Sequence, residues 1–246
     1  MTTAHPHPDG SEPGRASLEL ADWRRRVAEL YAVVRQRAAT DPEAAWDQWR
    51  AVREALYRDH PQSPVPAAAR GAFRSRHWPY DPGWRFEVDI RLDGAPESTG
   101  ALAPIGPAAA LALAAPAPLG SGFGLNLQLP MSTGDALSFT RLGEVRLPLP
   151  AGKRTLGLYW MAGYAGGIFL PFRDSTNGSA TYAAGRYLLD TAKSADLGGD
   201  VAAGRLILDF NFAFHPSCAF DPRWSCPLAP PDNRLDAAVE VGERLK

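Results

Sequence analysis

The chain has 246 residues, with 26 basic and 27 acidic side chains and a formal net charge of −1 at pH 7. This length suits one large domain, or one domain with an appendage, and is sufficient to bury a hydrophobic core. The balanced charge argues against a strongly basic protein, so we expect no nucleic acid among its partners. Gly and Pro contribute 23 residues each, which favours strands and turns over long helices.

The beginning of the chain is polar and rich in proline. We expect residues 1–16 to form a disordered leader, and because they lack the apolar run of a secretory signal we expect a cytoplasmic location. No segment reaches the ~18–20 apolar residues that span a bilayer, so we also expect no membrane contact. The uncharged stretch 98–134 has a longest apolar run of 108–115, which we interpret as a buried strand or an apolar loop.

Residues 17–60 predict a helical hairpin. Apolar side chains recur every three or four positions from Leu20 to Ala38, behind Ser17 as a plausible N-terminal cap. Asp41 and the proline after it predict the start of a second helix, whose apolar stripe includes Trp46 and Trp49. We expect the hairpin to pack on the outside or at one end of the remaining domain. An exposed face containing the two tryptophans would instead indicate a protein-interaction module.

Residues 61–246 predict a β domain. The segment 84–92 alternates strictly between apolar and polar residues, which is typical of a half-buried strand. Many short strands without intervening helices predict a mainly β fold, either an antiparallel sandwich or an open barrel. The other candidate strands are 125–129, 145–149, 154–160, 168–172 and 205–210, with 237–241 as a short strand or an extended tail.

The two cysteines, Cys218 and Cys226, are separated by seven residues. Buried free thiols, a disulfide, and a metal or redox role are three alternatives, and a reducing compartment favours the first. His215 and the cysteines are suitable zinc ligands, but the paired Cys-x-x-Cys spacing of structural zinc sites is absent. The glycine-rich segment 120–124 precedes a strand pattern rather than a helix, which argues against nucleotide binding. We therefore expect no metal and no cofactor.

Polar side chains concentrate in two segments of the second half of the chain. The first segment, 172–187, contains Arg173, Asp174, Tyr182 and Arg186. The second segment, 208–233, contains Asp209, Asn211 and Asn233.

These two segments resemble the uncharacterised prokaryotic family catalogued as domain of unknown function 1684. The resemblance extends over roughly residues 60–245, and it departs at His215, where the family usually has Asn, and at Ala229, where it usually has Pro. It implies no mechanism, because the family has no established activity. The matching motifs are Phe172-Arg173-Asp174, Thr181-Tyr182, Gly185-Arg186, Asp209-Phe210-Asn211, Pro216-Ser217-Cys218-Ala219, Cys226-Pro227-Leu228, Asn233 and Gly242-Glu243, with His60–Pro64, Pro79–Pro82 and Arg85 upstream.

The polar segments allow three interpretations. In a structural network, the buried Asp and Arg side chains would pair because an isolated buried charge is too costly. In a binding pocket, Arg173 and Arg186 would hold an anionic or polyhydroxylated ligand, with Asp174, Asn211 and Asn233 as further ligand-binding residues. In a catalytic centre, Tyr182 would donate or accept a proton and Asp209 would act as the base.

Our leading functional hypothesis is a cytoplasmic protein that binds a small polar or anionic molecule in this pocket. An enzyme of hydrolase type that uses the same acid and base residues is the first alternative, and the interaction module of the tryptophan-rich hairpin is the second. The oligomeric state is open.

Overall fold

The computed structural model describes residues 13–94, 126–149, 152–163, 166–200 and 203–245. The expected leader therefore falls outside the described residues as far as residue 12, as do the apolar run 108–115 and the glycine-rich segment 120–124. The first helix begins at Pro13, inside the expected leader. Ser17 does not cap this helix, because its hydroxyl donates to the Pro13 carbonyl one turn earlier.

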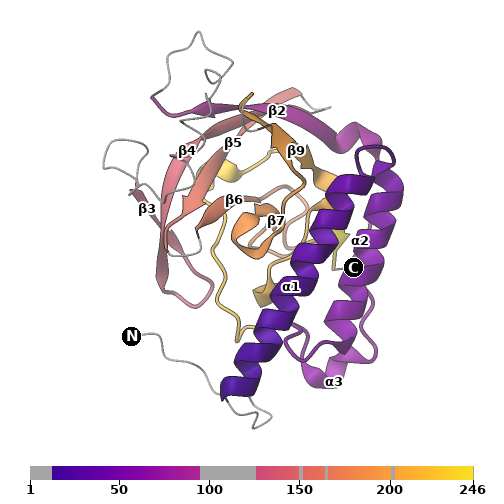
Figure 1. Cartoon of the computed structure of the whole chain (residues 1–246). Helices are drawn as coiled ribbons and strands as arrows, with labels where there is room; N and C mark the ends of the chain where they lie inside the picture. Colours follow the sequence, from indigo (N-terminus) through magenta and orange to yellow (C-terminus); the bar gives the residue numbers. More distant parts are fainter. Residues whose placement is uncertain (1–12, 95–125, 150–151, 164–165, 201–202, 246) are drawn as a thin grey trace, which may run out of the picture.

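Two long helices, α1 (Pro13–Arg37) and α2 (Pro42–Asp59), run side by side as the predicted hairpin (Figure 1). The Asp41 carboxylate caps α2 by accepting a hydrogen bond from the Ala44 amide. The short helix α3 (Ala67–Arg70) follows. No helix among the described residues is long and apolar enough to cross a membrane.

The rest of the described chain is a curled antiparallel sheet, open at its edges, so the prediction of a mainly β fold is confirmed. Seven strands follow the order β7-β6-β5-β4-β2-β9-β8, and β3 pairs with β4 beside β2. A separate two-stranded sheet joins β1 and β10. The strands are β1 (Arg76–His77), β2 (Arg85–Leu92), β3 (Asn126–Pro130), β4 (Ala136–Leu149), β5 (Gly152–Met161), β6 (Gly167–Phe172), β7 (Arg186–Asp190), β8 (Gly199–Asp200), β9 (Arg205–Asp209) and β10 (Glu243–Arg244).

Strand β4 is the longest and passes from β3 to β2 along one edge while β5 follows its other edge. Its register against β5 shifts between Arg141 and Gly143. Gly143 has a φ of 156°, and a Cβ at this position would collide with the Arg91 carbonyl of β2. The bulge therefore requires glycine, and it bends the sheet where β3 gives way to β2.

The structure differs from the expected strands at two places that matter for the site. Strand β9 ends at Asp209, one residue before the end of the expected strand 205–210, and a 3-10 turn over Phe210–Phe212 follows, so Asn211 lies in the turn. The segment 237–241 is not a strand, and the short strand β10 comes just after it.

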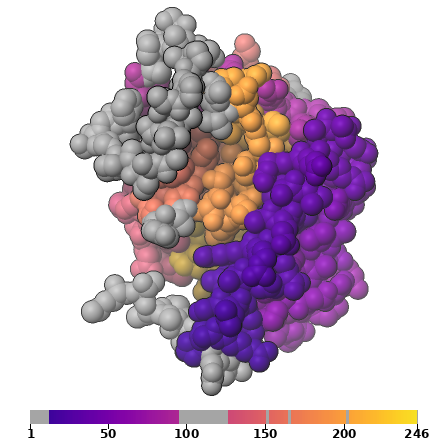
Figure 2. All heavy atoms as spheres, in the orientation of Figure 1, coloured from indigo at the N-terminus to yellow at the C-terminus, as the bar shows by residue number. Residues whose placement is uncertain are grey.

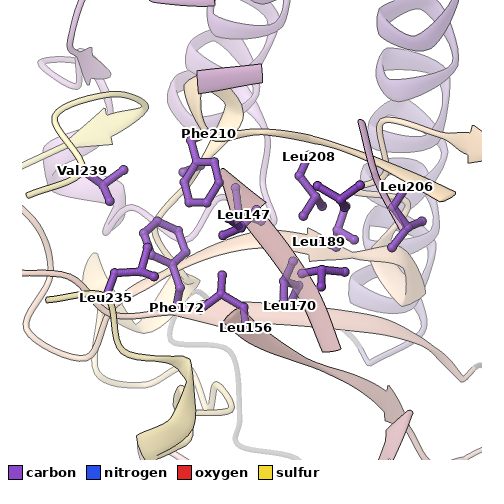
Figure 3. Packing of buried hydrophobic residues seen from close by; sticks show 14 of the residues in the cluster. Leu147, Leu156, Leu170, Phe172, Leu189, Leu206, Leu208, Phe210, Leu235 and Val239 are labelled. Carbon is purple, nitrogen blue, oxygen red and sulfur yellow. The ribbon is translucent and has the colours of Figure 1, made fainter. Parts of the chain in front are cut away.

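The main core lies on the concave side of the curled sheet and is closed by residues after β9 (Figure 3). The rings of Phe172 and Phe210 meet at 5.3 Å between centroids. Leu235, Val239 and other residues of the last segment pack on them, so this segment belongs to the core.

The helical hairpin covers one side of the molecule (Figure 2), as predicted. Leu30 and Val34 of α1 pack with Leu197, and Phe212 contacts Trp49 of α2. Trp46 and Trp49 are 5% and 1% exposed. The exposed tryptophan face that would have indicated an interaction module is therefore not found, because both side chains pack in this interface.

Candidate functional site

The Arg186 guanidinium, at the start of β7, is completely buried and holds four acceptors. It donates to Asp174 Oδ2 at 2.8 Å, to the carbonyls of Val239 at 2.8 Å and Val241 at 2.6 Å, and to that of Glu243 at 3.2 Å. Burial lowers the pKa of Arg186, an effect that the Asp174 charge opposes. The contact fixes the segment 239–243 against β7 and explains why an arginine is tolerated in the core.

A second network ties the end of β9 to the loop before β2. Asp209 Oδ1 accepts from the amide of Asn211 at 3.0 Å and from its side chain at 2.8 Å, while Oδ2 lies 3.4 Å from Tyr80 and Arg85. Burial raises the pKa of Asp209, although hydrogen bonds from Asn211 and Arg85 oppose the shift. The side-chain amide of Asn211 accepts a hydrogen bond from the Asp81 backbone N–H and donates one to the Asp81 carbonyl. Both predicted side chains are occupied by the protein itself.

The remaining predicted ligand residues, Asn233 and Arg173, lie near the end of β6. Asn233 accepts from the Gly157 amide at 2.8 Å and donates to the carbonyls of Gly157 and Pro171, thereby joining β5 and β6. The Arg173 amide donates to the Asn233 carbonyl, and its guanidinium donates to the Ala183 carbonyl at 3.1 Å. Both N–H donors of the Asn233 side chain are therefore used within the protein, and the side chain is fully buried.

Tyr182 belongs to a different neighbourhood from Asp209. Its backbone amide donates to His215 Nε2 at 3.2 Å, and its phenol lies near Cys218 closely enough for each to influence the pKa of the other. Burial, followed by the bond to Cys218, raises the pKa of Tyr182 to about 12. The seven residues chosen from the sequence thus do not surround one common centre, although Asn177 links the backbones of Asp174 and Tyr182. Their two segments meet through Phe172 and Phe210 rather than through shared ionic side chains.

A buried ionic cluster around Glu243 connects α2 to the last strand. Glu243 Oε2 accepts from Arg53 of α2 at 2.9 Å and from the His215 amide at 2.7 Å. Burial alone would raise the pKa of Glu243, but the Arg53 charge and the bonding to His215 outweigh it and hold the pKa well below its usual range. His77 lies between the rings of Trp46 and Trp49, and burial lowers its pKa to about 4.

A groove of about 480 Å³ opens beside this cluster, between α3, β1 and β10. One part of its wall is apolar and contains Val65, Phe73, Phe220 and Leu245. The basic side chains of Arg74, Arg76 and Arg244 line the other part, together with the already paired Glu243. Its remaining lining residues are Ala69, Ala72 and Ser75.

The pairing of β1 with β10 brings the arginines together. Arg76 lies directly opposite Arg244 in the antiparallel register, so their side chains share one face of the small sheet. Among the described residues, no carboxylate forms an ion pair with Arg74, Arg76 or Arg244. The Nε atom of Arg244 is buried and lacks a hydrogen-bond partner within the described part of the chain. The groove therefore has a positive rim.

A second groove, of about 810 Å³, lies between α1 and α2. Ion pairs such as Arg15–Glu19 and Arg26–Asp22 offset part of its charge. The acidic Glu29 and Asp59 also line it, so this groove has an acidic excess and no positive rim.

The chain was compared with known families and structures. The family described as "Protein of unknown function (DUF1684)" matches residues 121–244. The chain belongs to this family. The match confirms the resemblance to DUF1684 that the sequence showed. The matched residues include Arg244 and both cysteines, whereas Arg74 and Arg76 precede them.

A similar solved structure is that of an uncharacterized protein from Haloarcula marismortui, determined by solution NMR. It is 27% identical in sequence, with a TM-score of 0.52, and the alignment covers 84% of this chain and 96% of that chain. No curated protein is significantly similar to the chain. The relatives of this DUF1684 chain thus support the fold and leave its function to be argued from the geometry.

Proposed function

We propose that this DUF1684 protein binds a small organic anion in the groove between α3, β1 and β10. The observation that supports the proposal is the placement of Arg76 opposite Arg244, with Arg74 beside them and no carboxylate partner among the described residues. Like charges placed opposite one another across a strand pair repel. A bound carboxylate or phosphate would convert this repulsion into charge-assisted hydrogen bonds.

The groove also suits the rest of such a ligand. Its volume of about 480 Å³ lies within the usual range for small-molecule sites. Phe73 and Phe220, whose ring centroids are 5.9 Å apart, provide an apolar wall next to the basic rim. The ligand class that fits is an anion with an apolar portion, such as an aliphatic or aromatic carboxylate.

The polar residues selected from the sequence have a supporting role in this proposal. Arg186 holds the carbonyls of Val241 and Glu243, and so keeps β10 beside β1. The proposed ligand is of the anionic class expected from the sequence, but it lies at other arginines.

Acid and base catalysis of hydrolysis has less support. Asp209 and Tyr182 belong to separate networks, and neither of them lines the two grooves described above. A catalytic pair would have to approach one reacting bond together.

The test is a fluorescence titration with anilinonaphthalene sulfonate, an anion with a large apolar portion, followed by displacement with laurate and with inorganic phosphate. We expect saturable binding that laurate displaces. Substituting Arg244→Ala or Arg76→Ala should each weaken binding about tenfold, the effect of losing one charge-assisted hydrogen bond. Higher salt should weaken binding to the native protein.

Arg24→Ala is the matched control, because Arg24 is an exposed arginine of α1 that lines neither groove. It should bind the probe like the native protein. If the Arg76 and Arg244 variants keep native affinity while remaining folded by circular dichroism, the groove is not the binding site.

A further inference from the structure

The two cysteines form a close pair, with Cys218 in the η4 turn (Ser217–Ala219) and Cys226 in the loop that follows it. The Cys218 backbone amide donates to Cys226 Sγ at 3.4 Å, which places the two cysteines side by side. Both are free thiols, 7% and 6% exposed. The fold therefore places two reduced, buried cysteines next to one another.

Contacts to the strand region after β3 hold this pair in place. The Cys226 amide donates to Ser132 Oγ at 3.1 Å, and the Ser132 amide donates to the Cys226 carbonyl at 2.9 Å. Met131 and Pro227 form an adjacent β-bridge. The position of Cys226 is fixed by backbone contacts, whereas Cys218 lies in a single short turn.

The surroundings make the two thiols unequal. Hydrogen bonding from Cys226, opposed by burial and assisted by Ser132 and Tyr182, lowers the pKa of the Cys218 thiol to about 6. The bond to Cys218 and burial raise the pKa of the Cys226 thiol far above its usual range. The direction of these shifts favours Cys218 as the thiolate of the pair and Cys226 as the thiol.

We propose that Cys218 and Cys226 form a peroxide-reactive dithiol site, in which Cys218 is the attacking sulfur and Cys226 resolves the product to a disulfide. This site is independent of the arginine-lined groove. Its substrate class is a hydroperoxide, and because Cys218 is only 7% exposed, hydrogen peroxide itself is the substrate that suits the site best.

The chemistry balances without a further reactant. The Cys218 thiolate attacks one oxygen of hydrogen peroxide, the O–O bond breaks, and the departing hydroxide takes a proton to become water. Cys218 is then a sulfenic acid. The Cys226 thiol gives up its proton and attacks the Cys218 sulfur, so that the S–O bond breaks and a second water leaves. Two thiols are oxidised to one disulfide, and one peroxide is reduced to two waters.

Tyr182 acts in this scheme as a positioning residue. Its phenol is one of the neighbours that lower the pKa of Cys218, and so favours the thiolate. It does not exchange electrons or protons with the peroxide. Substituting Tyr182→Phe should therefore move the pH dependence of oxidation upward rather than abolish the reaction.

The first experiment treats the reduced, full-length protein with stoichiometric hydrogen peroxide and maps its peptides by mass spectrometry. We expect a disulfide between Cys218 and Cys226, with loss of both free thiols, and return of the thiols with dithiothreitol. The rate should be half-maximal near pH 6, the pKa of Cys218. This experiment needs no variant, so a folding defect cannot obscure it.

The second experiment assigns the roles. Cys226→Ser should stop at the sulfenic acid, trapped on Cys218 by dimedone, and Cys218→Ser should lose the fast reaction. Ser217→Ala, next to Cys218, is the matched control and should react like the native protein. Native protein that keeps both thiols after peroxide treatment, or a Cys226→Ser variant that yields no adduct at Cys218, contradicts the proposal.

Discussion

Arg186 shows how a charged residue becomes a structural centre. Its side chain is wholly inside the protein, yet its donors reach one carboxylate and three carbonyls. The carbonyls belong to 239–243, which has little regular structure to satisfy them. The guanidinium replaces the missing sheet partners for this segment.

We predict that Arg186→Met destabilises the protein by about 3–5 kcal/mol, because it leaves Asp174 buried without its partner and three carbonyls unsatisfied. Urea unfolding followed by circular dichroism measures the change. The control is Arg173→Met, since Arg173 is partly exposed and makes one carbonyl contact, and its loss should cost about 1 kcal/mol or less. Equal effects of the two substitutions would contradict this role for Arg186.

At the scale of elements, α2 is attached to the β domain by buried polar contacts in addition to apolar packing. Trp46 Nε1 donates to the Asn211 carbonyl at 2.8 Å, and Arg53 pairs with Glu243. The hairpin is therefore anchored at the turn after β9, which Asp209 caps, and at β10, whose Glu243 carbonyl Arg186 binds.

We predict that Trp46→Phe destabilises the protein by about 1–3 kcal/mol, because the Asn211 carbonyl stays buried without its donor. Amide hydrogen exchange should quicken in α2 more than in β4 and β5. Trp23→Phe is the control, because the Trp23 side chain packs on Tyr57 and His60 and no bond from its indole N–H is described. Unchanged exchange in the Trp46 variant would show that this bond does not anchor the helix.

Much of the arrangement of elements follows from local sequence patterns. The alternation in 84–92 predicted β2, and Asp41 with Pro42 predicted the start of α2. Strand β7 was not predicted, because all five of its residues are buried and a strand buried on both faces shows no alternation. The end of β9 was placed one residue too late. Asp209 has extended backbone angles and caps the turn that follows, and the sequence does not show that the strand ends there.

The candidate site was less accessible from sequence. Arg74 and Arg76 come long before Arg244, and no motif marks a pair of two-residue strands. Their significance depends on a register that only the folded chain creates. Asp174, Arg186, Asp209 and Asn233 were recognised as special, but sequence cannot distinguish a side chain that binds a ligand from one that binds its own backbone.

At the scale of the whole molecule, buried titratable groups link stability to pH. The folded-state pKa of His77 is lowered to about 4 by burial, so the unfolded chain binds a proton first as the pH falls below 6.5. The pKa of Glu243 is also depressed, so its contribution is present above pH 4.5 and is lost below it. Both groups therefore make the protein less stable in acid.

We predict that the free energy of unfolding falls between pH 6.5 and 4.5, and that His77→Phe reduces this dependence. Phenylalanine suits the pocket between Trp46 and Trp49, since neither ring nitrogen of His77 has a partner within the described residues. Urea titrations of both proteins over this pH range measure the difference. His215, whose pKa burial also lowers, should leave part of the slope in place.

Asp209 affects the pH dependence of stability in the opposite direction from His77. Burial raises the pKa of Asp209, so the folded protein takes up this proton before the unfolded chain does, and acidification toward the usual carboxyl pKa favours the folded state. This contribution is common to the native protein and the variant, so it cancels in their difference. Identical pH slopes for the two proteins would show that His77 stays uncharged, or equally charged, in both the folded and unfolded states.

The pairing of β1 with β10 has a kinetic consequence. These strands close a loop that contains the entire curled sheet, and contacts between such distant positions slow folding. We expect the pairing of β1 with β10 to form in the last step of folding, after the curled sheet has formed. A chain arrested before that step would have its strands but no opposed Arg76 and Arg244, so recovery of anion binding during refolding would time the completion of the native state.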